Sequence, residues 1–545
     1  MNFNQNIKIS IVLLIAFLSA LSAWAQPGSD LETSEVEIIK NFEASLLEAE
    51  KLSLSPTLPP LDTTSQRLIY SVPTPSLSVD YPAPTIRPIA MKAEKLPPRY
   101  NLYSKLGFGT PLSPYGELSY QKVFNGNLDV GGQLLHHSAN NSKNLDNQRF
   151  NLWDGDVYGT YYMDQGFAVS ANIGYEADIF HFYGYDHDVE SFEREQVKQK
   201  LNTFDLGAKF FNGERTQGDL NYYAEVDFSR LNDNYATSES NTILEFGFTK
   251  YFNDKHPLSV KLMTDFTNFD DNLETQQLHN YKLQPSFGFH QDRFKVNIGV
   301  NAIAHNDNFQ FYPMIDATVN ILGNRLAAFA GFKGDYEKNN FQNISDYNPF
   351  IVSRGIGINN TEYSEIYGGI RGNLKFIEYN GSVRYKDVNN LPLYLTNAAD
   401  TKRFDVLYDS VKIVNISGTV ELSLVKDLSI GGTVSQNIYT MTNEEKPWHL
   451  PAFELNAFAK YKALQDKLTV KAELFTANGV PYLDANGMAD NLNALFDLNL
   501  GASYWINKNI GAFVDVNNLF GNKRERWLRY PMYGLNVYGG VTVRF

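Results

Sequence analysis

The chain has 545 residues, a net charge of −14 at pH 7 and no cysteine. The acidic balance argues against binding nucleic acid through a basic face, and the absence of cysteine excludes a disulfide framework, thiolate metal sites and cysteine nucleophiles. Aromatic residues make up 14% of the chain, with 33 Tyr and 37 Phe, a composition that favours β-strands and membrane interfaces.

The N-terminus predicts a signal peptide over residues 1–25. Lys8 supplies its positive charge, residues 11–21 form its apolar run, and Ala23 and Ala25 form an A-x-A cleavage site. A transmembrane anchor is the alternative, but the apolar run is short for a bilayer and no basic stop-transfer cluster follows it. We therefore expect the mature chain to begin directly after this segment.

Residues 26–99 predict an extended, Pro-rich segment in the periplasm or in the lumen of a barrel. Eleven of the 22 prolines lie at or before Pro98, and this density favours a polyproline-like chain over a packed domain. Residues 34–42 could add as a strand to a partner sheet, but a short helix over residues 31–52, with Val36 and Ile39 on one face, fits the spacing better. We expect residues 31–98 to bind a periplasmic or envelope protein partner.

From residue 100 onward, segments of about ten residues alternate between apolar and polar side chains. Residues 294–305 place Phe294 and Ile298 on one face and Lys295 and Asn297 on the other, and residues 258–266 and 468–476 repeat the pattern. Alternation alone also fits a sandwich that turns its polar row to solvent, so it does not decide the fold.

Connection lengths favour an outer-membrane barrel. Connections of a few residues, near 125, 164, 290, 322, 425 and 507, take turns with much longer ones over 136–148, 183–196, 337–360, 386–409 and 476–491. Short turns on one rim and long loops on the other are typical of outer-membrane barrels. We predict an all-β fold: a transmembrane antiparallel barrel of about 22 strands over 100–545, with long loops extracellular and both chain ends periplasmic.

The last strand is expected to close the barrel by pairing with the first. Its alternating apolar row would face outer-membrane lipid and end on an aromatic residue. The residues expected in this closing row are Tyr533, Leu535, Val537, Val541, Val543 and Phe545.

Residues 514–545 resemble the final hairpin of TonB-dependent receptor barrels. That family typically ends in an Asn-Leu-Phe turn, a loop with Tyr-Pro, a Gly and an alternating strand that stops at Phe. The matching residues here are Asn518, Leu519, Phe520, Tyr530, Pro531, Gly534 and Phe545. Gly521 departs from the pattern, because the family often has Asp there. The resemblance implies that the outer-membrane assembly machinery recognises the C-terminal strand.

The N-terminus departs further from that family. Its receptors carry a globular plug of well over a hundred residues inside the barrel, whereas about 74 residues separate the predicted cleavage site from the first strand here. The chain also resembles a plug-less group that begins with a Pro-rich segment and a "Leu-Tyr-x-Lys-x-Gly-x-Gly" first strand. The matching residues are Leu102, Tyr103, Lys105, Gly107 and Gly109.

No pattern in the sequence indicates an enzyme, a cofactor or a bound metal ion. His136 and His137 are interpreted as polar loop residues, since neighbours on a strand point to opposite faces and cannot chelate one ion together. Residues 181–195 form an acidic loop, residues 484–490 are an incomplete calcium-loop pattern without a closing Glu, and the glycines of 355–360 lack a strand-turn-helix context.

Two functions remain open from the sequence. In the first, the barrel is a binding or structural subunit of an envelope complex, with loops or a partner filling the lumen. Inward charges such as Lys261, Asp265, Lys471 and Glu473 would prevent the lumen from collapsing into a dry core. In the second, supported by the family resemblance, the barrel is a TonB-dependent or passive transporter for a solute.

Overall fold

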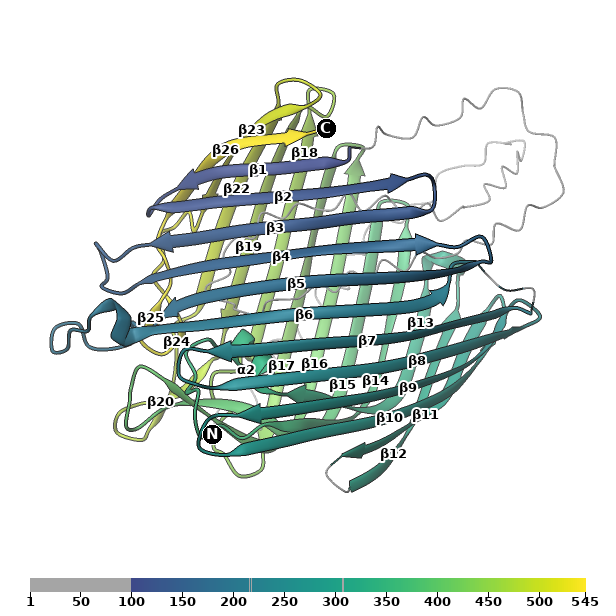
Figure 1. The fold of residues 1–545 in the computed structure, drawn as a ribbon, viewed down its shortest axis with the longest axis horizontal. Helices are drawn as coiled ribbons and strands as arrows, with labels where there is room; N and C mark the ends of the chain where they lie inside the picture. The colour runs from purple at the N-terminus through teal and green to yellow at the C-terminus, as the bar shows by residue number, and fades with distance from the viewer. Residues whose placement is uncertain (1–99, 215, 217, 306–307) are drawn as a thin grey trace, which may run out of the picture. The chain divides into compact units, whose positions relative to one another are not determined.

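A computed structural model describes residues 100–545, except 215, 217, 306 and 307 (Figure 1). The predicted signal peptide with Ala23 and Ala25, and the Pro-rich segment 26–99, lie outside the described residues. Both therefore stay predictions.

The described chain forms a closed antiparallel sheet of 22 strands, which confirms the predicted fold class and strand number (Figure 1). Strands that are neighbours in sequence pair as hairpins around the whole ring. In chain order the strands of the barrel are β1 (Leu102–Gly109), β2 (Ser113–Phe124), β3 (Leu128–Asn140), β4 (Arg149–Tyr162), β5 (Phe167–His181), β6 (Lys198–Asn212), β7 (Leu220–Asp233), β8 (Ser238–Phe252), β9 (His256–Asp270), β10 (Thr275–His290), β11 (Phe294–His305), β12 (Asn308–Asn320), β13 (Ala327–Asn339), β14 (Asn359–Leu374), β15 (Ile377–Thr396), β16 (Phe404–Val425), β17 (Leu428–Met441), β18 (Phe453–Ala463), β19 (Leu468–Asn478), β22 (Leu495–Trp505), β23 (Ile510–Asn517) and β26 (Asn536–Arg544).

The remaining elements are short and lie in the connections. Among the described residues, no helix is both long and apolar enough to cross a membrane. The short elements are the helix α2 (Phe341–Tyr347), the 3-10 turns η1 (Arg194–Val197) and η2 (Gly323–Arg325), and the strands β20 (Pro481–Leu483), β21 (Ala489–Asn491), β24 (Glu525–Trp527) and β25 (Tyr530–Pro531).

The barrel closes where β26 pairs with β1, between β2 and β23 (Figure 1). The register runs from Tyr103 opposite Arg544 to Gly109 opposite Tyr538. At the very end of the chain, the Phe545 N–H donates to the Leu102 carbonyl at 2.9 Å, and the Leu102 N–H donates back at 2.9 Å. The last residues therefore complete the ring of backbone hydrogen bonds and leave no open edge there.

The two rims of the barrel differ in the length of their connections. One rim, here called the short-turn rim, is joined by connections such as 125–127, 375–376 and 426–427. The opposite rim, here called the long-loop rim, carries the connections 182–197 and 340–358 among others. The long connections 442–452, 479–494 and 518–535 also lie there, whereas residues 234–237 and 271–274 form short links on the same rim.

Two connections are shorter than the sequence indicated. Strand β3 continues to Asn140, so His136 and His137 lie inside a strand rather than in a loop. Strands β15 and β16 pair up to Thr396 opposite Phe404, so most of 386–409 is strand. Polar residues can extend a barrel as a paired ribbon, because the ladder satisfies their backbone hydrogen bonds whatever the side chain.

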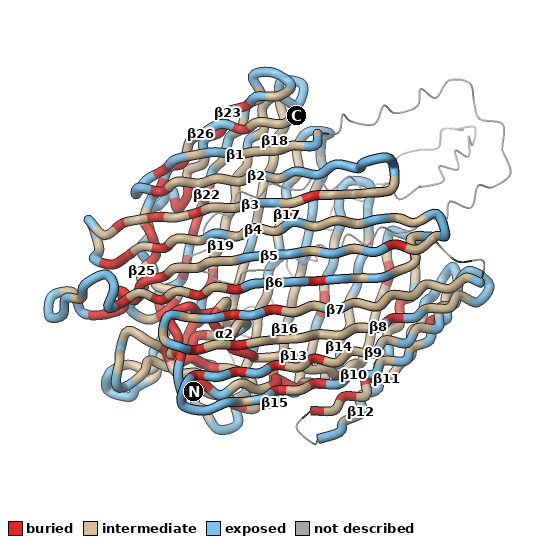
Figure 2. The backbone as a smooth tube through the Cα atoms, viewed as in Figure 1, coloured by how far each residue is buried: buried red, intermediate tan, exposed pale blue. Residues whose placement is uncertain are grey.

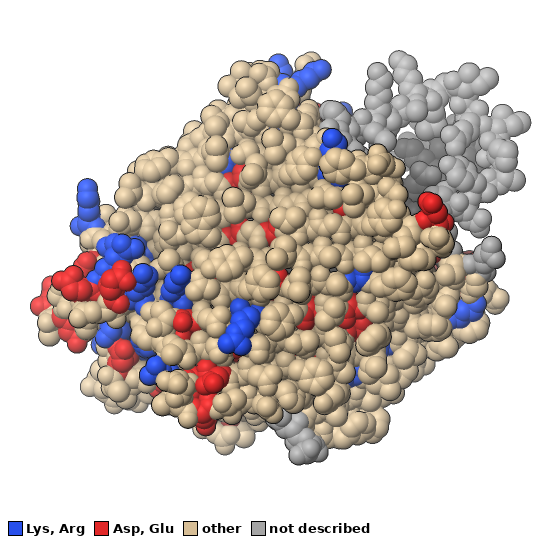
Figure 3. All heavy atoms as spheres, in the orientation of Figure 1, with Lys and Arg blue, Asp and Glu red and all other residues tan. Residues whose placement is uncertain are grey.

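The wall is apolar outside and polar inside. Ile298 and Val157 project outward and are 57% and 56% exposed, whereas Asp265 and Asn301 project inward and are 3% and 1% exposed. Neutral side chains cover most of the outer face shown in Figure 3, and charged residues gather at its long-loop end. This distribution suits a lipid-facing wall around a polar interior.

Several inward charges form ion pairs with one another. Lys338 Nζ lies 2.8 Å from an Asp265 carboxylate oxygen, and Lys105 Nζ lies 3.0 Å from Asp515 Oδ2. Because a buried charge without a partner is strongly unfavourable, these pairs stabilise a charged interior wall that does not collapse.

Candidate functional site: a loop cap across the barrel

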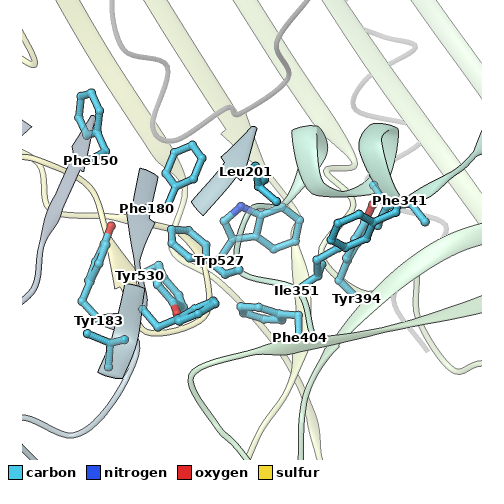
Figure 4. Close-up of a cluster of buried hydrophobic side chains, with 14 of the residues drawn as sticks. Phe150, Phe180, Tyr183, Leu201, Phe341, Ile351, Tyr394, Phe404, Trp527 and Tyr530 are labelled. Carbon is cyan, nitrogen blue, oxygen red and sulfur yellow. The ribbon is translucent and has the colours of Figure 1, made fainter. Parts of the chain in front are cut away.

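The buried core lies at the long-loop rim rather than along the barrel wall. Buried residues concentrate at that end of the tube in Figure 2, and Figure 4 shows their side chains packed against each other. We call this cluster the loop cap. Its buried members are Ala139, Phe150, Phe180, Phe182, Tyr183, Val197, Leu201, Leu231, Phe269, Phe341, Ile344, Phe350, Ile351, Ile356, Tyr394, Phe404, Trp527, Tyr530 and Tyr533.

The loop cap joins opposite walls of the barrel. Strands β5 and β16 are the fifth and sixteenth of the 22 strands, so they stand half a turn apart in the ring. Phe180 at the end of β5 and Phe404 at the start of β16 both belong to the cap and are 4% and 0% exposed. Side chains from the connections fill the distance between them (Figure 4).

A continuous series of aromatic rings makes this bridge. The Phe182 ring lies 6.5 Å from the Phe350 ring, which stacks on Tyr530 with centroids 3.7 Å apart. The Phe404 ring then contacts both Tyr530 at 6.1 Å and Trp527 at 5.5 Å. Edge and stacked ring contacts of this kind add to the free energy gained by burial.

Backbone bonding fixes the 340–358 connection to β16. The Phe404 N–H donates to the Phe350 carbonyl at 2.9 Å, and the Val352 N–H donates to the Phe404 carbonyl at 2.9 Å. Ile351 pairs with Phe404 as a parallel bridge. These backbone hydrogen bonds fix the middle of the connection to the start of β16.

The other end of the same connection is held by a buried carboxylate on β8. Glu239 is 2% exposed and accepts hydrogen bonds from the Asn340 amide at 2.7 Å, the Phe341 N–H at 2.7 Å and the Gln342 N–H at 3.1 Å. The Phe341 and Gln342 N–H groups belong to the first turn of α2, where backbone N–H groups have no acceptor within the helix.

Hydrogen bonds hold the 518–535 connection against the β3–β4, β5–β6 and β15–β16 connections. The Tyr530 hydroxyl donates to the Lys402 carbonyl, and the Tyr183 hydroxyl donates to the Pro531 carbonyl at 3.3 Å. The Gln148 amide donates to the same Pro531 carbonyl at 2.8 Å. The tight turn from β24 to β25 thus inserts its aromatic residues between three other connections.

His449 is buried against the aromatic rings of the cap. It is 1% exposed, its ring stacks on Trp527 with centroids 5.4 Å apart, and its Nδ1 lies 2.8 Å from the Tyr394 carbonyl. An Arg526 N–H donates to the His449 carbonyl at 3.0 Å. Burial, assisted by the Arg526 charge, lowers the pKa of His449 to about 3, so the ring is neutral at neutral pH.

The six residues expected in the lipid-facing row of the last strand do not all share one surface. Leu535, Val537, Val541 and Phe545 are exposed on the outer face, and Val543 is half-buried. Tyr533 was expected in the same row, but it is 8% exposed inside the loop cap. Strand β26 begins at Asn536, so the alternation that orients the later residues does not extend back to Tyr533.

Some residues of the hairpin motif are buried and others are exposed. Asn518 is buried and its amide donates to the Asn522 carbonyl at 2.6 Å and the Tyr533 carbonyl at 2.8 Å, which shapes the turn. Leu519 and Phe520 are exposed, at 39% and 59%. Tyr530, Pro531 and Gly534 lie in the 518–535 connection that forms the cap, and Phe545 is exposed after β26.

The residues considered for metal binding do not form a site. The described residues contain no group of three or more His, Asp or Glu side chains arranged to hold a metal ion. Asp484 instead accepts the Asn486 and Met488 N–H groups at 2.9 and 2.7 Å, and so closes its own turn. His137 is buried inside β3, where its Nε2 lies 3.0 Å from the Tyr538 hydroxyl of β26.

Comparison with known proteins supports the barrel fold of this chain and does not identify its ligand. No protein-family model matches the sequence, and no curated protein sequence matches it. Among solved structures, the ferric-catecholate import receptor Fiu of E. coli K12 has a TM-score of 0.64 and 10% identity over 82% of this chain and 82% of that chain. The FrpB iron transporter of Neisseria meningitidis has a TM-score of 0.65 and 10% identity over 83% and 82% of the two chains.

The pyoverdine outer-membrane receptor FpvA of Pseudomonas aeruginosa PAO1, bound to pyoverdine, is similar with a TM-score of 0.61 and 12% identity over 83% of this chain and 79% of that chain. The resemblance to TonB-dependent receptor barrels is therefore confirmed at the level of the fold.

Proposed function

We propose that this chain is an integral outer-membrane receptor barrel that binds its ligand or partner at the long-loop rim and is closed to free diffusion by its loop cap. The observation that carries the proposal is the aromatic bridge between walls half a turn apart, through Phe350 and Tyr530. A passive diffusion pore needs an open lumen, and the cap is a buried core laid across it. Gated transport stays the alternative, because a cap made of loops can move.

The proposal places the long-loop rim outside the cell and the short-turn rim, with both chain ends, in the periplasm. Outer-membrane barrels of the bacterial type carry their long loops on the extracellular side. The lack of cysteine provides a direct test, because single-cysteine variants can be labelled without background. Ala485→Cys lies in the exposed 479–494 connection and Gln465→Cys in an exposed short turn.

The labelling test uses a membrane-impermeant maleimide on intact cells. We expect reaction at residue 485 in intact cells and at residue 465 only after the outer membrane is broken. The reverse pattern would invert the proposed orientation, and no labelling at either residue until all membranes are dissolved would exclude the outer membrane as the location.

The proposal includes two protein partners. The first is a periplasmic or envelope protein bound through residues 31–98, which would make the barrel a subunit of a larger complex. The second is the outer-membrane assembly machinery, which would read the exposed row of Val537, Val541 and Phe545. Purification of tagged protein from outer membranes in mild detergent tests the first: a stoichiometric partner that is lost on deletion of 31–98 supports it, and a chain that purifies alone contradicts it.

A further inference from the structure

A cleft opens between the connections 479–494 and 518–535 on the long-loop rim. It has a volume of about 370 Å³. Its polar lining comes from both connections: Tyr482, Asn491 and Asn493 on one side and Lys523, Arg524 and Glu525 on the other. The aromatic core of the cap lies next to it, because Glu525 and Trp527 belong to the same strand, β24.

The cleft has a positive end. Lys523 and Arg524 are both exposed, and within the described chain neither side chain forms an ion pair or a hydrogen bond. Their backbone is nevertheless fixed, because the Met532 N–H donates to the Arg524 carbonyl at 2.9 Å and the Asn522 N–H donates to Asn518 Oδ1 at 3.0 Å. Two cations without an ion-pair partner among the described residues thus line this end of the cleft, next to the Glu525 carboxyl in the same lining.

The other end of the cleft carries uncharged polar groups and one carboxyl, which can form hydrogen bonds to a ligand. The Glu525 carboxylate accepts the Arg529 N–H at 2.9 Å, which leaves further acceptor positions on its oxygens. The Tyr482 hydroxyl lies 3.4 Å from Asp490 Oδ2. Burial raises the pKa of the Glu525 carboxyl above its usual range. The amides of Asn491 and Asn493 add donors and acceptors.

We propose that this cleft binds a polyhydroxylated anion, such as a sugar bearing a phosphate or carboxylate group, with the anionic group on Lys523 and Arg524 and the hydroxyls on Glu525, Tyr482 and the Asn side chains. A simple anion would use only the positive end, and a cation would be repelled by it. The ligand is either a free solute or the end of a surface glycan. The proposal deepens the proposed receptor function, since it names a ligand class for the long-loop rim.

The test is calorimetric titration of the full-length protein in detergent with glucose 6-phosphate. Glucose and glucosamine are matched neutral and cationic probes, and trigalacturonate represents the end of an acidic glycan. We expect saturable binding of glucose 6-phosphate or trigalacturonate, and weaker binding of glucose and glucosamine. The double variant Lys523→Ala/Arg524→Ala should weaken anion binding by at least about tenfold, because charge-assisted hydrogen bonds are lost.

Lys143→Ala is the matched control, since Lys143 is an exposed lysine in another connection of the same rim. It should bind like the unmodified protein. Binding of trigalacturonate alone supports a glycan end, and binding of glucose 6-phosphate supports a free solute.

The proposal is overturned if neither anion binds saturably, if glucosamine binds more tightly than the anions, or if the double variant binds normally while it still forms a heat-modifiable barrel. Surface labelling at residue 485 is independent of this titration, so a failed binding site and a failed receptor orientation can be told apart.

Discussion

The closing seam between β1 and β26 and the loop cap are held together in different ways. The seam is a ladder of backbone hydrogen bonds between neighbouring strands, with glycines where the chains approach closely. The cap consists of side chains from connections such as 182–197 and 518–535, which are hundreds of residues apart. The wall is therefore specified by a local pattern and the cap by long-range packing. Variants in each region should fail in different ways.

Breaking the seam has the largest expected effect. A Cβ at position 540 would overlap the Leu106 carbonyl oxygen and lie 2.6 Å from the Gly107 Cα on the neighbouring strand. We expect Gly540→Ala to prevent closure, measured as loss of the heat-modifiable barrel from outer membranes. Gly539→Ala is the matched control, because its Cβ would meet only the Phe513 carbonyl oxygen at 3.8 Å. Equal assembly of the two variants would contradict the seam geometry.

Removing the cap aromatics should leave the wall intact and open the lumen. Trp527 and Tyr530 are 0% and 1% exposed, and truncating a buried aromatic side chain costs about 3–5 kcal/mol. We expect Trp527→Ala/Tyr530→Ala to assemble normally and to raise conductance in planar bilayers. Phe520→Ala, in the same connection but 59% exposed, should change neither property. A cap variant as non-conducting as the control would show that these rings do not close the lumen.

Weakening the anchor of α2 should loosen one part of the cap. Glu239→Gln keeps the size of the side chain but replaces one of the two oxygens that accept hydrogen bonds at the start of the helix with an amide NH₂ that cannot accept. We expect a local loss of about 2 kcal/mol, seen as faster hydrogen exchange over 340–358. Glu190→Gln, on an exposed loop, is the control. Unchanged exchange over 340–358 would mean that packing alone holds the helix.

Acidification should produce an effect of similar size, confined to the surroundings of His449. Because burial lowers its pKa to about 3, the unfolded cap binds a proton between pH 6.5 and 3 that the folded cap does not bind. Cap stability therefore falls as the pH falls, by about 2 kcal/mol at pH 5. Hydrogen exchange over 442–452, corrected for intrinsic rates, measures this. His449→Gln should abolish the pH dependence, and an equal dependence in that variant would place its origin elsewhere.

The sequence predicts the barrel wall well because the alternation of apolar and polar residues within each strand is a local signal. The alternation over 294–305 orients Ile298 outward and Asn301 inward, and the Gly and Asn residues at 125–127 mark a turn without knowledge of the rest of the chain. The same local reasoning misplaced His136, His137 and the stretch 386–409, because polar residues indicate a loop even where paired strands extend beyond the apolar band.

The cap could not be predicted in this way. Phe350, Phe404 and Trp527 meet only because the ring brings the β13–β14 connection, the start of β16 and the β23–β26 connection together, and no periodicity in any one segment encodes that meeting. The available signal was compositional: aromatic residues such as Trp448 and Trp527 occur inside connections that are otherwise polar. Tyr533 shows the same limit, since its sequence parity matches the outward row but its strand has not yet begun.

The most direct test of the central claim is the single-channel conductance of the chain that lacks residues 31–98 and keeps its cap. If the loop cap closes the lumen, this protein should stay non-conducting in planar bilayers, and adding Trp527→Ala/Tyr530→Ala to it should open a large, stable conductance. A large conductance of the deletion variant with its cap intact would contradict the account, because the barrel would then owe its closure to the N-terminal segment.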